Sequence, residues 1–124
     1  MSKYENLLVW KKAHELVLEI YRVTTQFPDA EKYGIVVQMR RSAASIPTNI
    51  SEGHGRLYRR EYIRFLAIAR GSACELEYQL ILARDLGYLD KEKTDELLGK
   101  LREILRMLNG LINTLKKSQG TCDL

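Results

Sequence analysis

Apolar side chains recur every three or four residues along most of the chain, and this spacing predicts helices rather than strands. Pro28, Gly53 and Gly87 interrupt the pattern, because proline and glycine favour helix ends and turns. The intervals between them predict four helices, over residues 7–26, 30–52, 58–86 and 91–117. Helices of this length joined by short turns form an antiparallel up-down-up-down four-helix bundle. We therefore expect an all-α fold, with residues 1–124 in one domain.

The expected helix ends carry their own signals. Asn6 precedes the first apolar repeat and is the expected N-cap of the first helix, and Asp90 is the expected N-cap of the fourth. Gly53 and Gly87 are expected to take the left-handed conformation that ends a helix. The apolar repeat of the fourth helix stops at Leu115, so we expect the residues from 116 onward to form a polar tail.

The second expected helix contains Pro47 inside an unbroken apolar register. A proline removes one backbone hydrogen bond and clashes with the carbonyl four residues earlier, which is that of Ala43. Because the register continues past the proline, we expect one kinked, continuous helix. Two short helices, separated by a cap and a restart at residues 45–47, are the alternative. The register is Val36, Met39, Ala43, Ile46 and Ile50.

The fourth expected helix has three apolar positions in every seven residues. A two-position seam is enough for a dimeric coiled coil, whereas three positions suit either a bundle interior or a bundle with an additional contact between subunits. The pattern allows both. The first stripe consists of Leu97, Leu101, Ile104, Leu108, Leu111 and Leu115, and the second of Leu98, Leu105 and Ile112.

Positive charge is concentrated in one part of a chain whose net charge is +4. Residues 40–70 contain seven arginines, two glutamates and no lysine. Guanidinium groups bind phosphates and carboxylates through two parallel hydrogen bonds and stack on aromatic rings. The arginine cluster therefore favours a nucleic acid or an acidic protein as partner. A solvated or ion-paired surface is the alternative.

Most of these arginines surround the expected turn between the second and third helices. Arg60 and Arg64 are four residues apart and share a helix face. Tyr58 and Tyr62 alternate with them and would add stacking surface for bases. The candidate nucleic-acid-binding residues are Arg40, Arg41, Arg56, Arg59, Arg60, Arg64 and His54, with Lys11 or Lys12 as lesser contributors.

Two features leave alternatives open. Arg40 and Arg41 project about 100° apart on a helix, so they cannot share a narrow face. We expect one of them to pair with Glu75 or Glu77 of the third helix and the other to face outward. His54 lies between two glycines and is either a solvated turn residue or an additional donor to an anion.

The sequence contains no constellation that indicates an enzyme. The segment HELVLE, which begins at His14, lacks the second histidine of a HExxH zinc motif. Cys74 and Cys122 have neither zinc-site nor disulfide-framework spacing, which fits a reducing cytoplasm. No apolar run has the length of a signal peptide core or a membrane span. We expect no metal, no cofactor and no catalytic residues.

Several segments together resemble the family of 23S rRNA intervening-sequence proteins, which includes the accessory variability determinant proteins of diversity-generating retroelements. The central block RR-x-A-x-SIP-x-NI-x-EG is specific to this family, and the resemblance extends over about residues 7–115. The segments are LLVWKKAHEL (7–16), FP (27–28), E-x-YG (31–34), QMRRSAASIPTNISEGHGR (38–56), EYIRFLAIARGSACELEYQL (61–80) and ARDLGYL (83–89).

The resemblance implies an antiparallel four-helix bundle that assembles as a ring-like homopentamer with a basic channel or outer surface. Relatives from retroelements bind nucleic acid and a reverse transcriptase, and the family has no established catalytic residues to transfer to this chain.

Two functions follow as hypotheses. The first is a non-enzymatic, oligomeric accessory protein that binds RNA or DNA through its arginines. The second is a protein-interaction scaffold whose arginines bridge subunits or bind an acidic protein such as a reverse transcriptase. In both cases we expect self-association, no membrane contact and a cytoplasmic location.

Overall fold

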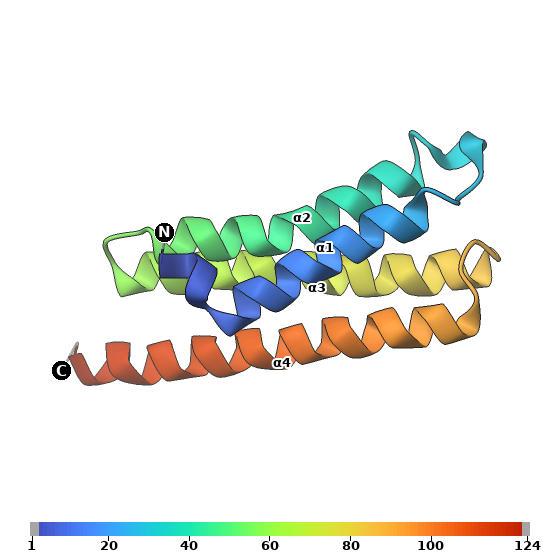
Figure 1. Cartoon of the computed structure of the whole chain (residues 1–124). Helices are drawn as coiled ribbons and strands as arrows, with labels where there is room; N and C mark the ends of the chain where they lie inside the picture. Colours follow the sequence, from blue (N-terminus) through green and yellow to red (C-terminus); the bar gives the residue numbers. More distant parts are fainter. Residues whose placement is uncertain (1–2, 123–124) are drawn as a thin grey trace.

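The computed structural model describes residues 3–122 and consists of four long helices and two short 3₁₀ turns (Figure 1). No strand occurs in this range. In Figure 1 the chain reverses its direction at each of the three connections between the long helices. The elements are η1 (Lys3–Asn6), α1 (Leu8–Thr24), η2 (Asp29–Glu31), α2 (Ile35–His54), α3 (Arg59–Asp85) and α4 (Lys91–Cys122).

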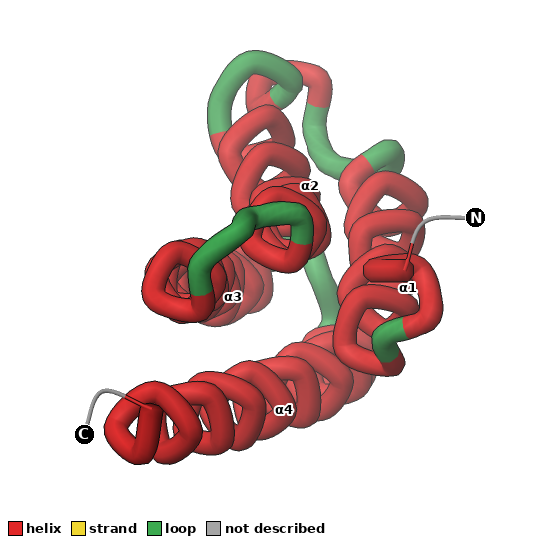
Figure 2. Tube along the Cα trace, turned by 90° about the vertical axis from the view of Figure 1, so that its left-hand side faces the viewer, coloured by secondary structure: helices red, strands yellow, loops and turns green. Residues whose placement is uncertain are grey.

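The helices form a ring in which α1 contacts α2 and α4, and α3 contacts the same two helices from the other side (Figure 2). Each helix buries its predicted apolar stripe in one shared core, because a stripe with helical periodicity presents a single face. In α4, Leu98 and Ile112 of the second stripe are buried and Leu105 is half-buried. The second stripe therefore contributes to the bundle interior, and an additional contact between subunits stays a prediction.

Most helix boundaries lie within two residues of those predicted, and the starts of α1 and α2 and the end of α4 differ in ways that matter. The N-cap of α1 is Leu7 rather than Asn6, and it makes no side-chain capping bond. α2 begins at Ile35 instead of residue 30, since residues 29–31 form a 3₁₀ turn and Gly34 has a backbone conformation outside the helical region. α4 continues to Cys122, so the expected polar tail is helical as far as the structure describes it, and residues 123–124 lie outside the described range.

The connection between α3 and α4 follows its predicted signals. Gly87 has a φ of +82°, the only positive φ among the described residues. The amides of Gly87 and Tyr88 donate to the carbonyls of Arg84 and Ala83, which closes α3 with a Schellman motif. Asp90 then caps α4, because its Oδ1 accepts a 2.7 Å hydrogen bond from the amide of Lys93.

Pro47 lies inside one continuous α2, as expected, and the two-helix alternative is wrong. A kink at this position stays a prediction. Gly53 remains helical and does not take the predicted left-handed conformation. Its role is spatial, because a Cβ at Gly53 would lie 2.7 Å from the Cβ of Phe65 and 2.9 Å from the Cδ1 of Tyr62. The glycine lets α2 and α3 approach each other closely just before the turn that joins them.

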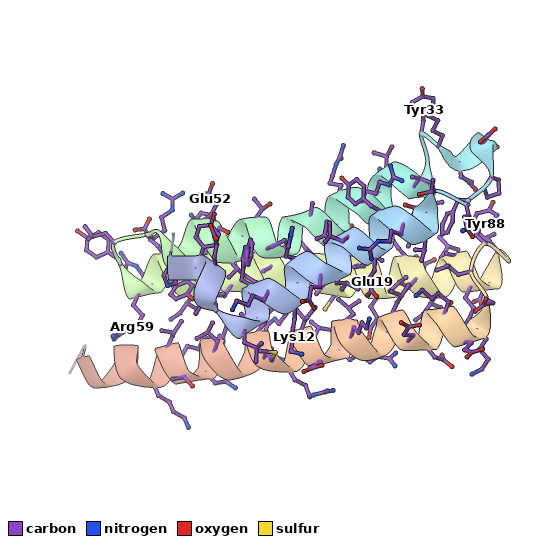
Figure 3. The ribbon with its side chains drawn as sticks, viewed as in Figure 1. Lys12, Glu19, Tyr33, Glu52, Arg59 and Tyr88 are labelled. Carbon is purple, nitrogen blue, oxygen red and sulfur yellow. The ribbon has the colours of Figure 1, made fainter. Side chains whose placement is uncertain are left out.

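The opposite end of the bundle is held by a contact between η2 and the α3–α4 connection. The hydroxyl of Tyr88 donates a 2.7 Å hydrogen bond to Glu31, and the ring of Tyr88 packs on Phe27 (Figure 3). The Glu31 carboxylate raises the pKa of Tyr88, since it stabilises the protonated hydroxyl.

Candidate nucleic-acid interface

The turn between α2 and α3 exposes a short run of basic and apolar side chains. Gly55 and Arg56 close α2 through hydrogen bonds from their amides to the carbonyls of Ser51 and Gly53. Tyr58 is extended and starts α3, because its carbonyl accepts from the amides of Glu61 and Tyr62. Arg56, Leu57, Tyr58, Arg59 and Arg60 are all exposed, and we call these five residues the turn cluster.

Two arginines share one aromatic ring beside this turn. The guanidinium carbons of Arg56 and Arg64 lie 4.7 and 4.9 Å from the ring centroid of Phe65. Arg56 also forms a 3.2 Å ion pair with Glu52, in which both side chains remain largely exposed. An exposed pair of this kind contributes little stability and opens readily when an anion competes for the arginine. Phe65 thus positions two guanidinium groups at the surface; the donors of Arg64 are unpaired among the described residues, and Arg56 donates to Glu52.

Arg60 is exposed and makes no hydrogen bond, ion pair or ring contact with any described residue. Arg64, one helical turn further along α3, contacts only the Phe65 ring within this part of the chain. Arg59 lies at the start of α3 (Figure 3). It already has an interaction partner, so it is not counted among the unpaired arginines. Arg60 and Arg64 therefore carry most of the unpaired positive charge at this end of α3.

Arg40 and Arg41 do not belong to the turn cluster, because about 15 residues of helix, or roughly 22 Å, separate them from it. Arg40 donates to Thr24 Oγ1 at 2.9 Å and to the Tyr21 carbonyl at 3.2 Å, and it lies 4.6 Å from the Tyr21 ring. It therefore fastens α2 to the end of α1. Arg41 is exposed without a partner among the described residues.

The expected ion pair between α2 and a glutamate of α3 is not formed. Glu75 accepts a 3.4 Å hydrogen bond from Ser42, and Glu77 pairs with Arg102 of α4 at 2.9 Å. The prediction failed because Arg40 turns toward α1, whose last carbonyls attract a cation.

His54 and Tyr62 are packing residues at the base of the turn. Their rings meet edge to face at 5.7 Å, and both side chains are half-buried. Burial raises the pKa of Tyr62. The expected stacking surface therefore contains Tyr58 but not Tyr62. Leu57 was not predicted as a site residue, since a single leucine in a turn gives no periodic signal.

The lysines of α1 and α4 divide into paired and exposed groups. Lys12 pairs with Glu103 of α4 at 3.2 Å, and Lys100 pairs with Glu19 at 2.7 Å, so these charges join α1 to α4 (Figure 3). Lys11 and Lys116 are exposed. The C-terminal part of α4 lies at the same end of the bundle as the α2–α3 turn (Figure 1), so Lys116 adds to its positive charge.

No group of three or more histidine, cysteine or acidic side chains is arranged to hold a metal ion in the described range. None of the described helices is both long enough and apolar enough to span a membrane. A cleft of about 380 Å³ lies between α1 and α4, and it is lined by the two lysine–glutamate pairs just described.

These features define a class of protein, a four-helix bundle with an arginine-rich turn at one end. The chain matches the family model described as 23S rRNA-intervening sequence protein over residues 5–110, and it belongs to that family. The resemblance seen in the sequence motifs is thereby confirmed.

A solved structure supports the same conclusion. It is described as a protein of unknown function from the S23 ribosomal protein family of Bacteroides thetaiotaomicron. The TM-score is 0.77 and the sequence identity 28%, and the match covers 85% of this chain and 98% of the other. None of the curated proteins compared with the chain gives a significant match.

Proposed function

We propose that this protein is a non-enzymatic, oligomeric accessory protein that binds RNA or DNA through the arginines around the α2–α3 turn. The observation that carries the proposal is the exposure of Arg60 and Arg64 without a carboxylate partner in the described structure. Unpaired guanidinium groups on one helix face, about 6 Å apart along its axis, suit successive phosphates of a nucleic-acid backbone.

The remaining candidates contribute unequally to the proposed surface. Arg56 and Arg59 extend it across the turn, and Arg41 is an isolated outlying cation. Arg40 is not assigned to direct contact, because its Nε and Nη2 donate to residues of α1. His54 is half-buried against Tyr62 and supports the turn instead of binding an anion.

Self-association is part of the proposal, and the outward face of α3 is its candidate surface. Ile68 and Tyr78 are 41% and 63% exposed on this face, with Gly71 between them. No atom lies within 4 Å of the position that a Cβ of Gly71 would occupy, so a neighbouring subunit can approach the backbone there. A homopentamer, which the family resemblance implies, would repeat the arginine turn five times and convert weak contacts into avidity.

A protein-interaction scaffold is the alternative, and Arg64 is the residue that favours it. Arg64, Ile68 and Tyr78 lie on the same exposed face of α3, so Arg64 would be close to a subunit contact or to an acidic partner such as a reverse transcriptase. The free, exposed thiol of Cys74 is compatible with a cytoplasmic location for either function.

A charge-reversal experiment distinguishes the two functions. The double variant Arg60→Glu/Arg64→Glu is compared with Lys32→Glu/Lys91→Glu, which makes the same change in charge at the opposite end of the bundle (Figure 1). Binding of RNA and DNA is titrated against salt, and the oligomer mass is measured by light scattering after size exclusion.

Nucleic-acid binding predicts a steep loss of affinity with salt for the wild type and the control variant, and a strong loss of affinity in the arginine variant with its oligomer intact. Loss of the oligomer in the arginine variant supports the scaffold. Negligible binding of wild type at low salt contradicts the proposed function.

A further inference from the structure

The turn cluster contains the most exposed apolar surface near the arginines. Leu57 is 85% exposed and Tyr58 is 62% exposed. They lie between Arg56 on one side and Arg59 and Arg60 on the other. A ligand that covered this leucine and tyrosine would remove apolar surface from water, which favours binding at the tip of the turn.

The fold itself does not use these two side chains. Tyr58 starts α3 through its backbone carbonyl, a role that any residue with an extended backbone fulfils. No hydrogen bond or ring contact involves the side chain of Tyr58 in the described structure. Tyr62, in contrast, packs against His54 and beside Gly53. The two tyrosines of this segment therefore have separate roles, and only Tyr58 is available to a ligand.

We propose that the tip of the α2–α3 turn binds unpaired bases of single-stranded nucleic acid. A base stacks on the ring of Tyr58 and packs against Leu57, while the backbone phosphates on either side contact Arg60 and Arg56. This inference rests on the proposed function and adds to it the class of ligand that the surface selects.

Stacking explains why the apolar tip and the arginines occur together. Each base has two aromatic faces, and stacking on an exposed protein ring is favourable without regard to sequence. In a duplex those faces are already covered by neighbouring base pairs, so Tyr58 and Leu57 gain nothing from double-stranded nucleic acid. The arginines bind phosphates of either form. The tip therefore provides the discrimination, and the arginines provide the common affinity.

An anionic membrane is the other polyanion with apolar groups beside its charges. Binding to a membrane surface requires a broad apolar face that is buried among the lipid chains. The turn cluster offers only Leu57 and Tyr58, and its unpaired charge continues along α3 to Arg64. The charge complementarity of this surface therefore favours a strand that follows the helix.

The experiment measures fluorescence anisotropy with a labelled oligouridylate and oligothymidylate of 12 nucleotides, and with a 12-base-pair mixed-sequence duplex, at low salt. Wild type is compared with Tyr58→Ala, Tyr58→Phe and Arg60→Glu/Arg64→Glu. We expect Tyr58→Ala to weaken single-strand binding about tenfold and leave duplex binding unchanged, as loss of one stacked base requires. Tyr58→Phe keeps the ring and should bind as wild type does. The variant Arg60→Glu/Arg64→Glu should lose binding to both the single strands and the duplex.

The outcomes separate this inference from the proposed function. If wild type binds single strands and duplex equally and Tyr58→Ala changes neither, the arginines bind nucleic acid but the tip does not read bases. If wild type binds neither ligand, both proposals are overturned. Binding to phosphatidylglycerol vesicles that is lost in Tyr58→Ala, without preference for single strands, would assign the tip to a membrane surface. Circular dichroism of each variant checks that the helices are retained.

Discussion

Gly53 of α2 lies directly against Phe65 of α3, and the structure leaves no room for a side chain between them. An added Cβ would be 2.7 Å from the Cβ of Phe65 and 3.2 Å from the carbonyl oxygen of Tyr62. Phe65 in turn supports the guanidinium groups of Arg56 and Arg64. The close approach of two helices therefore determines where two arginines of the candidate interface stand.

Replacing Gly53 with alanine should destabilise the protein. The added methyl meets a Cβ and a backbone atom, neither of which can rotate away, so α2 and α3 must separate. We expect a loss of about 1–3 kcal/mol in the free energy of unfolding, measured by urea denaturation. Gly99→Ala is the matched control, because this helical glycine has no atom within 4 Å of its added Cβ. That change should stabilise by about 0.5–1 kcal/mol. Equal stability of the two variants would contradict the close-contact explanation.

Arg40 and Arg41 should respond differently to substitution although they are adjacent. Arg40→Ala removes hydrogen bonds to Thr24 and Tyr21 and leaves buried Thr24 with fewer partners. We expect a loss of about 1–2 kcal/mol in unfolding free energy. Arg41→Ala should leave stability within about 0.5 kcal/mol of wild type, since its side chain is exposed and unpartnered in the described structure. The stabilities of the two variants are compared by thermal denaturation followed by circular dichroism. If Arg41→Ala were the less stable variant, the contact of Arg40 with α1 would not be stabilising.

The contact between α1 and α2 can be observed through Trp10, the only tryptophan in the chain. Its Nε1 donates a 3.0 Å hydrogen bond to Ser51 Oγ, and Ser51 donates to the Pro47 carbonyl at 2.9 Å. Ser51→Ala should shift the tryptophan emission and reduce stability by about 1 kcal/mol, because the indole loses its partner. Thr48→Ala, which removes an exposed hydroxyl bonded only to Ala44 of its own helix, is the control and should leave the emission unchanged. An unaltered emission in Ser51→Ala would contradict this hydrogen bond.

The outward face of α3 provides a test of self-association. Ile68→Glu/Tyr78→Glu places charge on the proposed contact and should release monomers, measured by light scattering against the 14.4 kDa mass of one chain. Tyr33→Glu is the control, since Tyr33 is also exposed but lies in the connection before α2 and not on α3 (Figure 3). A wild-type protein that is already monomeric at micromolar concentration would contradict the proposed oligomer.

Local signals predicted the parts of the fold that local chemistry determines. The Schellman turn at Gly87, the Asp90 cap and the continuity of α2 through Pro47 were all readable, because each depends on residues a few positions apart. The start of α2 could not be predicted from local signals, since Glu31 is held by Tyr88, which belongs to a distant segment.

The candidate site shows the same division. The sequence identified the arginine-rich turn, because its composition is unusual over a short stretch. It could not assign the partner of Arg40, which depends on where α1 ends in space. The alternation of arginine and tyrosine alone did not separate exposed Tyr58 from half-buried Tyr62, which packs against His54.

The hydrogen bond between Tyr88 and Glu31 should make stability depend on alkaline pH. The ordinary pKa of a tyrosine hydroxyl is 10.0. The Glu31 carboxylate raises the pKa of Tyr88 in the folded protein, because deprotonation would remove the hydrogen-bond donor and place two negative charges together. A raised folded pKa means that the contribution is fully present below pH 10 and is lost as the pH rises through the folded pKa. Tyr88→Phe lacks this contribution at every pH. Urea denaturation of both proteins at several pH values between 8 and about 11.5 should therefore show wild type more stable at pH 8, with the difference shrinking above pH 10. A difference that stays constant across this range would show that the hydroxyl does not bond to Glu31 in solution.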